Sequence, residues 1–164
     1  MPTTQPTTET TTGRDDPRLT AVGLLFEVAN AMERRLAPDL AAAGLAGSEF
    51  EVLIRLGRTE GASLRMADLA RQAGLSASGA TRLVDRLQAR GLVERRACES
   101  DGRVSYAVLT DAGRGVVAEV LPVHVATIER WYTGVLAPEQ LEQLNDALRA
   151  VRAEVHPDAE QGAS

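Results

Sequence analysis

The segment from Gly74 to Val108 constrains the fold of this chain more than any other part. Ser76 can cap a helix, and the amphipathic pattern that follows it ends at Gly91. Two β-rich runs come next, Leu92–Ala97 and Val104–Val108, joined by a polar loop that contains arginine. A helix followed directly by a hairpin, with arginines on the exposed parts of both, predicts a winged helix-turn-helix.

The helix predicted after Ser76 has two faces of different chemistry. Ala80, Leu83, Val84 and Leu87 recur at helical spacing and form an apolar face. The opposite face carries hydroxyls and guanidinium groups, which suit base edges and phosphates in a major groove. The same pattern occurs on ordinary surface helices with solvated arginines, and the neighbouring short helix, turn and hairpin favour DNA binding. The residues predicted to contact DNA from this helix are Ser76, Ser78, Gly79, Thr81, Arg82 and Arg86.

The tip of the predicted hairpin reads RRACESDGR from Arg95 to Arg103. Asp101 and Gly102 form a dipeptide that favours a tight turn. Arg96 and Arg103 are predicted to reach a minor groove or phosphates beside the docked helix. Asp101 can orient an arginine through a bidentate pair, and stabilisation of the loop by Asp101 and Arg103 is a compatible alternative.

The net charge of −5 is unevenly distributed along the chain. From Arg65 to Arg103 there are eight arginines and five acidic residues, so this segment carries +3 and the rest of the chain −8. A nearby phosphate responds to the local potential, because charges farther away than about 8 Å are screened in physiological salt. The acidic total is therefore compatible with DNA binding.

The remaining elements are predicted from caps, breaks and apolar spacing. Gly74 is free to adopt the left-handed conformation at the end of a short helix. In chain order the pattern predicts a helix over Leu19–Leu36 ended by Pro38, a helix from a cap at Ser48 to about Gly57, a short strand over Ser63–Arg65, a two-turn helix over Met66–Ala73, and a long helix capped by Thr110 and kinked at Pro122.

A last helix, starting near Pro138, places apolar residues alternately three and four positions apart, which is the spacing of a coiled-coil seam. Core packing and dimerisation both fit this pattern. Dimerisation is favoured because the first helix also has a long apolar stripe and the two helices flank a compact central module. The predicted dimer residues are Leu25, Val28, Leu141, Leu144, Leu148, Val151 and Val155.

One mainly α-helical domain with a small β-hairpin wing is therefore expected over residues 18–156. Its DNA-binding lobe covers about residues 46–109, and its dimerisation region about 18–45 and 110–156. Residues 1–17, rich in Thr, Pro and Gln, are expected to be a disordered tail, and residues 157–164 a polar tail. There is no secretory signal or membrane-length apolar run, and the single cysteine, Cys98, fits a reducing compartment. A soluble, cytoplasmic protein is expected.

Three pieces of the sequence, in this order, resemble the MarR family (multiple antibiotic resistance regulators) of bacterial transcription regulators: LRMADLARQAGLS, ATRLVDRLQARGLVER and SDGRVSYAVLTDAG. The resemblance covers about Arg18 to His156. It implies a homodimer formed by the terminal helices, two winged lobes, binding to palindromic operators, and repression. It also implies control in many members by a small molecule bound between the dimer region and the lobes. By this resemblance Ser76, Ser78, Thr81, Arg82 and Arg86 belong to the recognition helix, and Asp101 and Arg103 to the wing.

A small aromatic or anionic effector is accordingly expected. Arg34, Arg130 and Trp131 are the predicted effector residues, with Trp131 in a dimer core and solvated arginines as the alternative reading.

Other functions fit the sequence less well. A winged-helix module for protein partners would need apolar anchors on the exposed helix face, which Thr81, Arg82 and Arg86 do not provide. A thiol-responsive regulator is a further alternative, because Cys98 lies next to two arginines. His124 and His156 have no ligand cluster around them, so neither a metal nor a cofactor is expected. Since no catalytic motif is present either, an enzyme is not expected.

Overall fold

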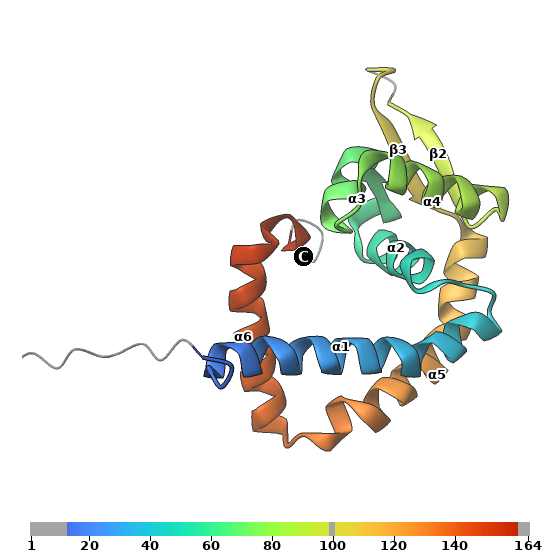
Figure 1. Ribbon diagram of the computed structural model, residues 1–164. Coiled ribbons are helices and arrows are strands. Elements are labelled where there is room, and N and C mark those ends of the chain that lie inside the picture. The colour runs from blue at the N-terminus through green and yellow to red at the C-terminus, as the bar shows by residue number, and fades with distance from the viewer. Residues whose placement is uncertain (1–12, 99–100, 161–164) are drawn as a thin grey trace, which may run out of the picture.

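The computed structural model describes residues 13–98 and 101–160, and Figure 1 shows their arrangement. The elements are α1 (Pro17–Ala42), α2 (Gly47–Arg58), β1 (Ser63–Arg65), α3 (Met66–Gln72), α4 (Ala77–Ala89), β2 (Val93–Ala97), β3 (Ser105–Leu109), α5 (Asp111–Trp131) and α6 (Pro138–Val155), with 3-10 turns η1 (Glu60–Ala62), η2 (Thr133–Val135) and η3 (Pro157–Glu160). Two parts can be distinguished: a lobe built from the short helices α2, α3 and α4 and a small sheet, and the long helices α1, α5 and α6 below it.

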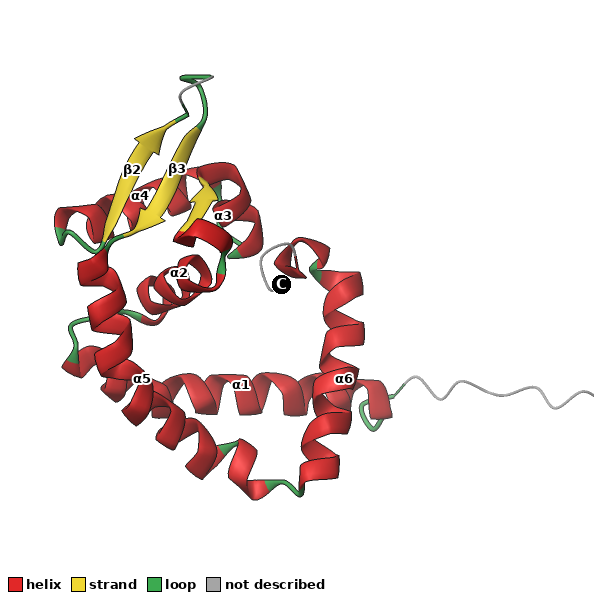
Figure 2. Cartoon of the chain, turned by 180° about the vertical axis from the view of Figure 1, so that it is seen from behind, coloured by secondary structure: helices red, strands yellow, loops and turns green. Residues whose placement is uncertain are grey.

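The lobe contains α2, α3, α4 and an antiparallel sheet of order β1-β3-β2, as Figure 2 shows from behind. Arg96 lies opposite Tyr106 across β2 and β3, and Arg65 lies opposite the same residue across β1 and β3. The sheet and three helices enclose one core, whose fully buried side chains include Leu53, Leu56, Leu69, Val84, Leu87 and Val93. The mainly α-helical fold with a β wing is therefore confirmed.

The helix caps predicted at Ser76 and Thr110, at the starts of α4 and α5, are confirmed. The Ser76 hydroxyl accepts a hydrogen bond from the Gly79 amide at 3.0 Å, which fixes the first turn of α4. Thr110 caps α5 in the same way, through the Gly113 amide at 3.0 Å. Gly74 takes a φ of +63°, so α3 ends in a left-handed turn that leads into α4. The apolar face predicted for α4 (Ala80, Leu83, Val84 and Leu87) is buried in the lobe.

The prediction that Pro38 ends the first helix is wrong. Helix α1 continues through Pro38 and ends at Ala42, and Gly44, two residues later, has a φ of +67°. Proline removes one backbone donor and disturbs the helix near its ring. Here the loss falls close to the end of the helix, and the following turn is stabilised because Leu40 is buried in the core of the lobe.

Helix α2 is also capped differently from the prediction. Its N-cap is Ala46 rather than Ser48, and the Glu49 carboxylate accepts a hydrogen bond from the Ala46 amide at 3.1 Å. An acidic side chain at the third helical position thus reaches back to the amide of the N-cap residue, and no serine hydroxyl caps this helix. The helix ends at Arg58, one residue later than expected. Strands β2 and β3 each begin one residue later than predicted, and β3 ends one residue later.

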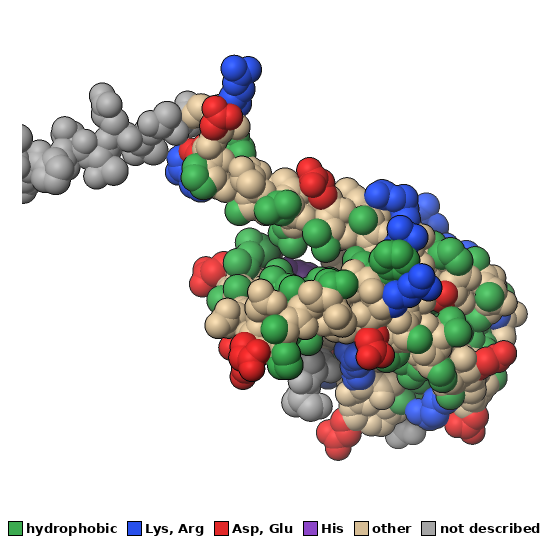
Figure 3. Space-filling view, turned by 90° about the horizontal axis from the view of Figure 1, so that it is seen from below, with side chains coloured by type: hydrophobic (Ala, Val, Ile, Leu, Met, Phe, Trp, Pro, Cys, Tyr) green, Lys and Arg blue, Asp and Glu red, His purple; other side chains and the backbone are tan. Residues whose placement is uncertain are grey.

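The long helices α1, α5 and α6 lie away from the hairpin end of the lobe and carry many exposed apolar side chains. Helix α5 contains Pro122 and changes direction along its length in Figure 1. In the view from below, hydrophobic side chains run along these helices (Figure 3). The exposed large ones on these helices are Leu19, Val22, Leu24, Leu25, Phe26, Val28, Leu121, Val123, Val125, Trp131, Val151 and Val155. None of the helices in the described ranges has the length and hydropathy needed to cross a membrane.

The two predicted tails lie only partly within the described residues. Residues 1–12 and 161–164 are outside them. Asp16 caps α1 by accepting a hydrogen bond from the Arg18 amide at 2.9 Å. The turn η3 lies against α3, where Asp158 forms an ion pair with Arg71 at 3.5 Å.

Candidate nucleic-acid interface

Helix α4 presents the predicted DNA-contacting face to solvent. Ser76, Ser78, Thr81, Arg82 and Arg86 are exposed along it, beside the hairpin of β2 and β3 (Figure 1). Gly79 is half-buried at the cap, where an added Cβ would lie 3.1 Å from the Ser76 hydroxyl oxygen. A glycine at this position therefore keeps the cap close to the helix.

Arg82 lies over the first turn of α4. Its Nε donates to the Ser78 carbonyl at 3.3 Å, and its Nη2 lies 3.5 Å from the Ser78 hydroxyl. Within the described residues no carboxylate comes within ion-pair distance of this guanidinium. Arg82 is thus not paired with an acid among the described residues, and it lies in the N-terminal half of the exposed helix, where a helix end also favours an anion.

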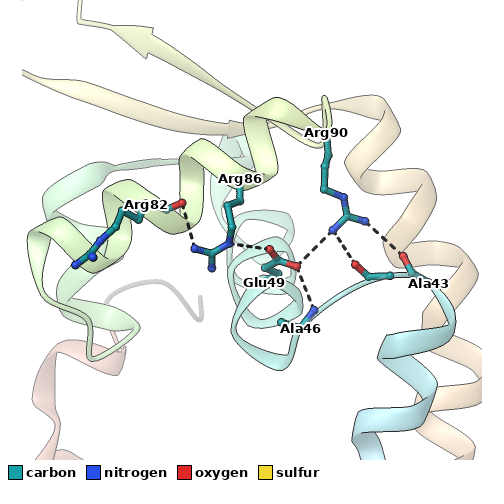
Figure 4. A network of polar contacts seen from close by, with 7 residues as sticks. Ala43, Ala46, Glu49, Arg82, Arg86 and Arg90 are labelled. Atoms are coloured by element: carbon teal, nitrogen blue, oxygen red, sulfur yellow. Dashed lines mark hydrogen bonds and ion pairs between the residues drawn. The ribbon is translucent and has the colours of Figure 1, made fainter.

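Arg86, which the sequence places on the same face of α4, forms an ion pair with a residue of α2. Figure 4 shows its guanidinium turned toward Glu49 of α2, with Nε and Oε1 3.3 Å apart. Arg90 approaches the other carboxylate oxygen, at 3.4 Å, and donates to the Gly44 carbonyl at 2.9 Å. The side chain of Glu49 is only 9% exposed, and a carboxylate this deep needs such partners.

This contact between Glu49, Arg86 and Arg90, together with the Ala46 amide, is called the Glu49 network below. It joins the start of α2 to the second half of α4 and so fixes the angle of the exposed helix. Sequence reasoning missed both Glu49 and Arg90. A glutamate at the third position of α2 was a possible signal for a cap, but its arginine partners lie some 37 to 41 residues away in sequence.

The hairpin is tied to α4 by a second contact. Arg95 of β2 pairs with Asp85 at 3.1 Å and donates to the Thr81 carbonyl at 3.3 Å. Its neighbour Arg96 is exposed and pairs with Glu94. The wing and the helix are therefore held together at the base of the hairpin by an arginine that the sequence analysis did not assign to the site.

At the tip of the wing, Asp101 organises the turn. Its carboxylate accepts a hydrogen bond from the Arg103 amide at 3.0 Å, and its carbonyl accepts one from the Val104 amide at 2.9 Å. The bidentate pair predicted for Asp101 is replaced, among the described residues, by this backbone contact, which agrees with the alternative of loop stabilisation. The side chain of Arg103 is exposed. Glu99 and Ser100, between Cys98 and Asp101, lie outside the described residues.

Comparison with known proteins identifies the fold and its family. A family model described as MarR family matches residues 43–104. The crystal structure of AbsC, a MarR family transcriptional regulator from Streptomyces coelicolor, is 34% identical in sequence, with a TM-score of 0.81 over 88% of this chain and 98% of AbsC. The chain belongs to the MarR family. Its family is thus one of transcriptional regulators rather than enzymes.

Two further relatives in the MarR family are informative. Sco3205 from Streptomyces coelicolor, whose structure is in complex with DNA, is 29% identical, with a TM-score of 0.79 over 92% of this chain and 94% of that one. The transcriptional repressor MprA of Escherichia coli is 33% identical over 111 residues, or 66% of this chain. This match spans 63% of the length of MprA.

The predicted effector residues of this MarR protein lie on the surface of the long helices. Trp131 is 40% exposed, and the guanidinium groups of Arg35 and Arg130 lie 4.0 and 4.9 Å from the centre of its ring. Arg34 is exposed on α1. Stacking of two arginines on one indole forms a flat, positively charged surface.

A cavity of about 230 Å³ lies where α1 and α5 meet α2 of the lobe. The ring of His124 packs on Phe50, with ring centres 4.8 Å apart, and its Nδ1 lies 4.0 Å from Asp39 Oδ2. Neither of these two atoms has a hydrogen-bond partner in the described ranges. Burial lowers the pKa of His124, and Asp39 opposes this shift. The cavity is lined by Glu33, Leu36, Ala37, Leu40, Gly47, Phe50, Glu51 and His124, so the predicted effector residues are not part of it.

The residues predicted for dimerisation separate into two groups. Leu25, Val28, Val151 and Val155 are exposed, and Leu141, Leu144 and Leu148 are half-buried. Helix α6 has no buried residue over its whole length. The seam predicted from the sequence therefore has an apolar side that this single chain leaves uncovered.

Cys98 and His156 lie apart from these surfaces. Cys98 follows β2 toward the tip of the wing, where its amide donates to the Val104 carbonyl at 2.9 Å. His156 caps the end of α6, and its Nε2 lies 3.2 Å from the Gln72 carbonyl oxygen. The described part of the chain holds no cluster of three or more His, Cys, Asp or Glu residues suited to a metal ion.

Proposed function

We propose that this chain is a homodimeric repressor that binds a pseudo-palindromic DNA operator and is released from it by a small effector. The observation that carries the proposal is the exposed α4 face. It bears Ser78, Thr81 and a positively charged Arg82, and the Glu49 network and Arg95 hold it at a fixed angle to the wing. DNA bound to Sco3205 and the repressor activity in the name of MprA support the same function.

The structure suggests different tasks for the two arginines of α4. Arg82, at the N-terminal half of the helix, is the residue that we expect to contact a base edge, as guanidinium groups do with guanine. Arg86 is engaged with the buried Glu49 carboxylate and serves mainly to position the helix. Arg103 at the wing tip, with its turn fixed by Asp101, is expected to contact phosphates or a minor groove.

Dimerisation would follow from the apolar surfaces of the long helices. A contiguous apolar surface of this kind marks an interaction site in a water-exposed protein. Two lobes related by a two-fold axis would then meet successive major grooves, with half-sites about 34–36 Å apart. With about four phosphates neutralised by each protomer, the logarithm of the binding constant would fall with the logarithm of salt concentration with a slope of about −7.

The effector site that we propose is the cavity between the long helices and the lobe. Phe50 and His124 line it and pack on each other, and His124 Nδ1 has no hydrogen-bond partner among the described residues. A small aromatic ligand with a polar group would pack on Phe50 and bond to this nitrogen. Because the cavity joins α1 and α5 to α2, its occupant would change the angle between the lobes.

The DNA-binding proposal is tested by fluorescence anisotropy with DNA from upstream of the gene and with scrambled DNA of the same length. Arg82→Ala is expected to weaken specific binding by about 1–3 kcal/mol. Arg149→Ala is a matched control, since Arg149 is an exposed arginine of α6 that pairs with Asp146 at 2.8 Å. Equal loss in the two variants would contradict a role for α4. If the folded chain binds no upstream sequence, selection from random DNA decides whether it binds DNA specifically at all.

A further inference from the structure

The side chain of Arg90 joins the end of the recognition helix α4 to the end of the long helix α1. Its Nη1 donates to the Gly44 carbonyl at 2.9 Å, and its Nη2 lies 3.5 Å from the Ala43 carbonyl oxygen. Both carbonyls belong to the turn that follows α1, and Figure 4 shows the guanidinium between this turn and Glu49. Through this one group the DNA-binding helix contacts the region that we propose for dimerisation.

The backbone on each side of this contact is held in a helix-ending turn. In the turn after α1, Gly44 has a φ of +67°, and the amide after it donates to the Leu40 carbonyl at 2.9 Å. In the turn after α4, Gly91 has a φ of +70°, and the amide after it donates to the Leu87 carbonyl at 3.0 Å. Leu40 and Leu87 are both buried in the core. Arg90 therefore connects two turns whose own conformations are fixed.

Electrostatics favour a cation at this place. The last carbonyl groups of a helix carry partial negative charge, and a positive side chain beside them is stabilising. Helix α1 has no basic residue in its last turn, where Asp39 adds a negative charge instead. Arg90 supplies from α4 the positive charge that the end of α1 lacks. The Glu49 carboxylate, 3.4 Å from Nη1, holds the same guanidinium from α2.

The contact depends on the shape of the arginine as well as on its charge. The planar guanidinium of Arg90 donates in several fixed directions, whereas a lysine ammonium is a compact charge on a flexible stem. Here the acceptors come from two places, the turn after α1 and the start of α2. A lysine at position 90 would keep the charge beside Glu49 but would not bridge both places at once.

We propose that Arg90 is a positioning residue, which fixes α4 relative to α1 and thereby the half-site spacing that the protein accepts on DNA. The inference rests on the proposed function, because a spacing exists only where two lobes bind one operator. In such a dimer the two recognition helices are connected through Arg90, α1 and the interface between the chains. Without the contact each lobe keeps its base-reading face, but the two lobes turn more freely relative to each other. Sequence reading and spacing thus belong to different arginines, Arg82 and Arg90.

Operators of different central length test this role. Selection from random DNA with the full chain supplies the preferred paired site. One base pair inserted at its centre, or removed from it, displaces one half-site by about 3.4 Å and about a tenth of a turn. The wild-type chain is expected to bind these altered duplexes about tenfold or more weakly than the selected site, the effect of losing one or more base contacts.

Arg90→Lys is expected to select the same half-site sequence and to show a several-fold smaller difference between the selected and altered duplexes. Arg149→Lys is the matched control, since Arg149 is an exposed arginine of α6 that pairs with Asp146 at 2.8 Å. It should keep the wild-type ratio of affinities. Fluorescence anisotropy with each duplex measures all three chains.

The ratio of affinities separates positioning from a general effect on folding. Lower stability weakens binding to both duplexes by the same factor, and so does the loss of a phosphate contact. A wild-type ratio in Arg90→Lys would therefore overturn the inference, whatever the absolute affinity. A wild-type chain that selects no paired half-sites would contradict the proposed operator, and the inference with it.

Hydrogen exchange of the chain without DNA tests the contact itself. In Arg90→Lys the amides of residues 43–45 should exchange roughly fivefold faster, because about one hydrogen bond that holds their turn is lost. Amides in the first half of α1 should exchange at the wild-type rate. Unchanged exchange at residues 43–45 would overturn the link between the two helices, and this result does not depend on the proposed function.

Discussion

The lobe and the long helices of this protein differ in how completely they bury their apolar residues. Leu53, Leu56 and Leu87 of the lobe are fully buried within the chain itself. Phe26 of α1 and Val155 of α6 are 61% and 74% exposed. The lobe thus buries its core within one chain, whereas the long helices leave large apolar side chains exposed. In the dimer proposed above, a second chain would cover these side chains, and the helices would set the spacing of the two lobes.

The largest expected effect comes from the core of the lobe. Leu53→Ala should lower the free energy of unfolding by about 2–5 kcal/mol, because a fully buried leucine leaves a cavity behind. Urea denaturation followed by circular dichroism measures this loss. Glu142→Ala, at an exposed polar position of α6, is the control and should change stability much less. A similar loss at both positions would contradict the difference between the two regions.

The next effect concerns assembly rather than folding. Val151→Asp places a charge on the apolar seam of α6 and should weaken dimerisation by about 2 kcal/mol or more, as expected at an interface hot spot. Ala153→Asp, two residues away on the opposite side of the same helix, should leave assembly unchanged. Sedimentation at several protein concentrations measures both. Two equally dimeric variants, or a wild-type chain that is monomeric at micromolar concentration, would contradict the role given to α6.

The Glu49 network gives a smaller effect that joins folding to function. Glu49→Gln should destabilise the lobe by about 2 kcal/mol, because a hydrogen-bonded charge with little exposure is lost. DNA affinity should fall as well, since Arg86 and Arg90 no longer fix the angle of α4. Glu51→Gln is the control: its carboxylate is half exposed and pairs with Arg55 along one helix, which contributes less than about 1 kcal/mol. DNA binding of Glu49→Gln at the wild-type level would show that the network does not position the helix.

The smallest effect is a pH dependence at the boundary between the two regions. Burial lowers the pKa of His124, so in the folded protein it stays neutral to a lower pH than in the unfolded chain. The unfolded state takes up the proton first as the pH falls below about 6.5, the ordinary value for histidine. Stability contributed by neutral His124 is therefore complete above that pH and is lost below it.

This pH effect is measured by urea denaturation at pH 7.5 and pH 5.5. Between pH 7.5 and pH 5.5, the free energy of unfolding of His124→Gln should fall less than that of the wild-type chain. A nuclear magnetic resonance titration of the His124 ring gives the same information without a variant. A midpoint at or above the ordinary histidine value would contradict the burial account.

Local signals in the sequence predicted most of the lobe. Ser76 and Thr110 cap the helices expected of them, and the apolar face of α4 is buried as its spacing indicates. These features depend on neighbouring residues, which a single sequence displays directly. The end of α1 was predicted wrongly, because the burial of Leu40 outweighs the local effect of Pro38.

The candidate site was predictable in its position but not in its internal contacts. The exposed face of α4 and the turn at Asp101 could be assigned from caps, spacing and turn residues. The Glu49 network and the pair between Arg95 and Asp85 join residues that are distant in sequence or on different elements, so no local pattern reveals them. For the same reason the cavity at His124 appears only when the helices are placed in space.

Hydroxyl-radical footprinting on a DNA site obtained by selection tests the central claim most directly. If two rigid lobes are spaced by a dimer of long helices, the footprint should show two symmetry-related protected patches, about one helical turn, or 10–10.5 base pairs, apart. Arg82→Ala should remove both patches at protein concentrations that saturate the wild-type site. A single protected patch, or protection that does not depend on Arg82, would contradict the account.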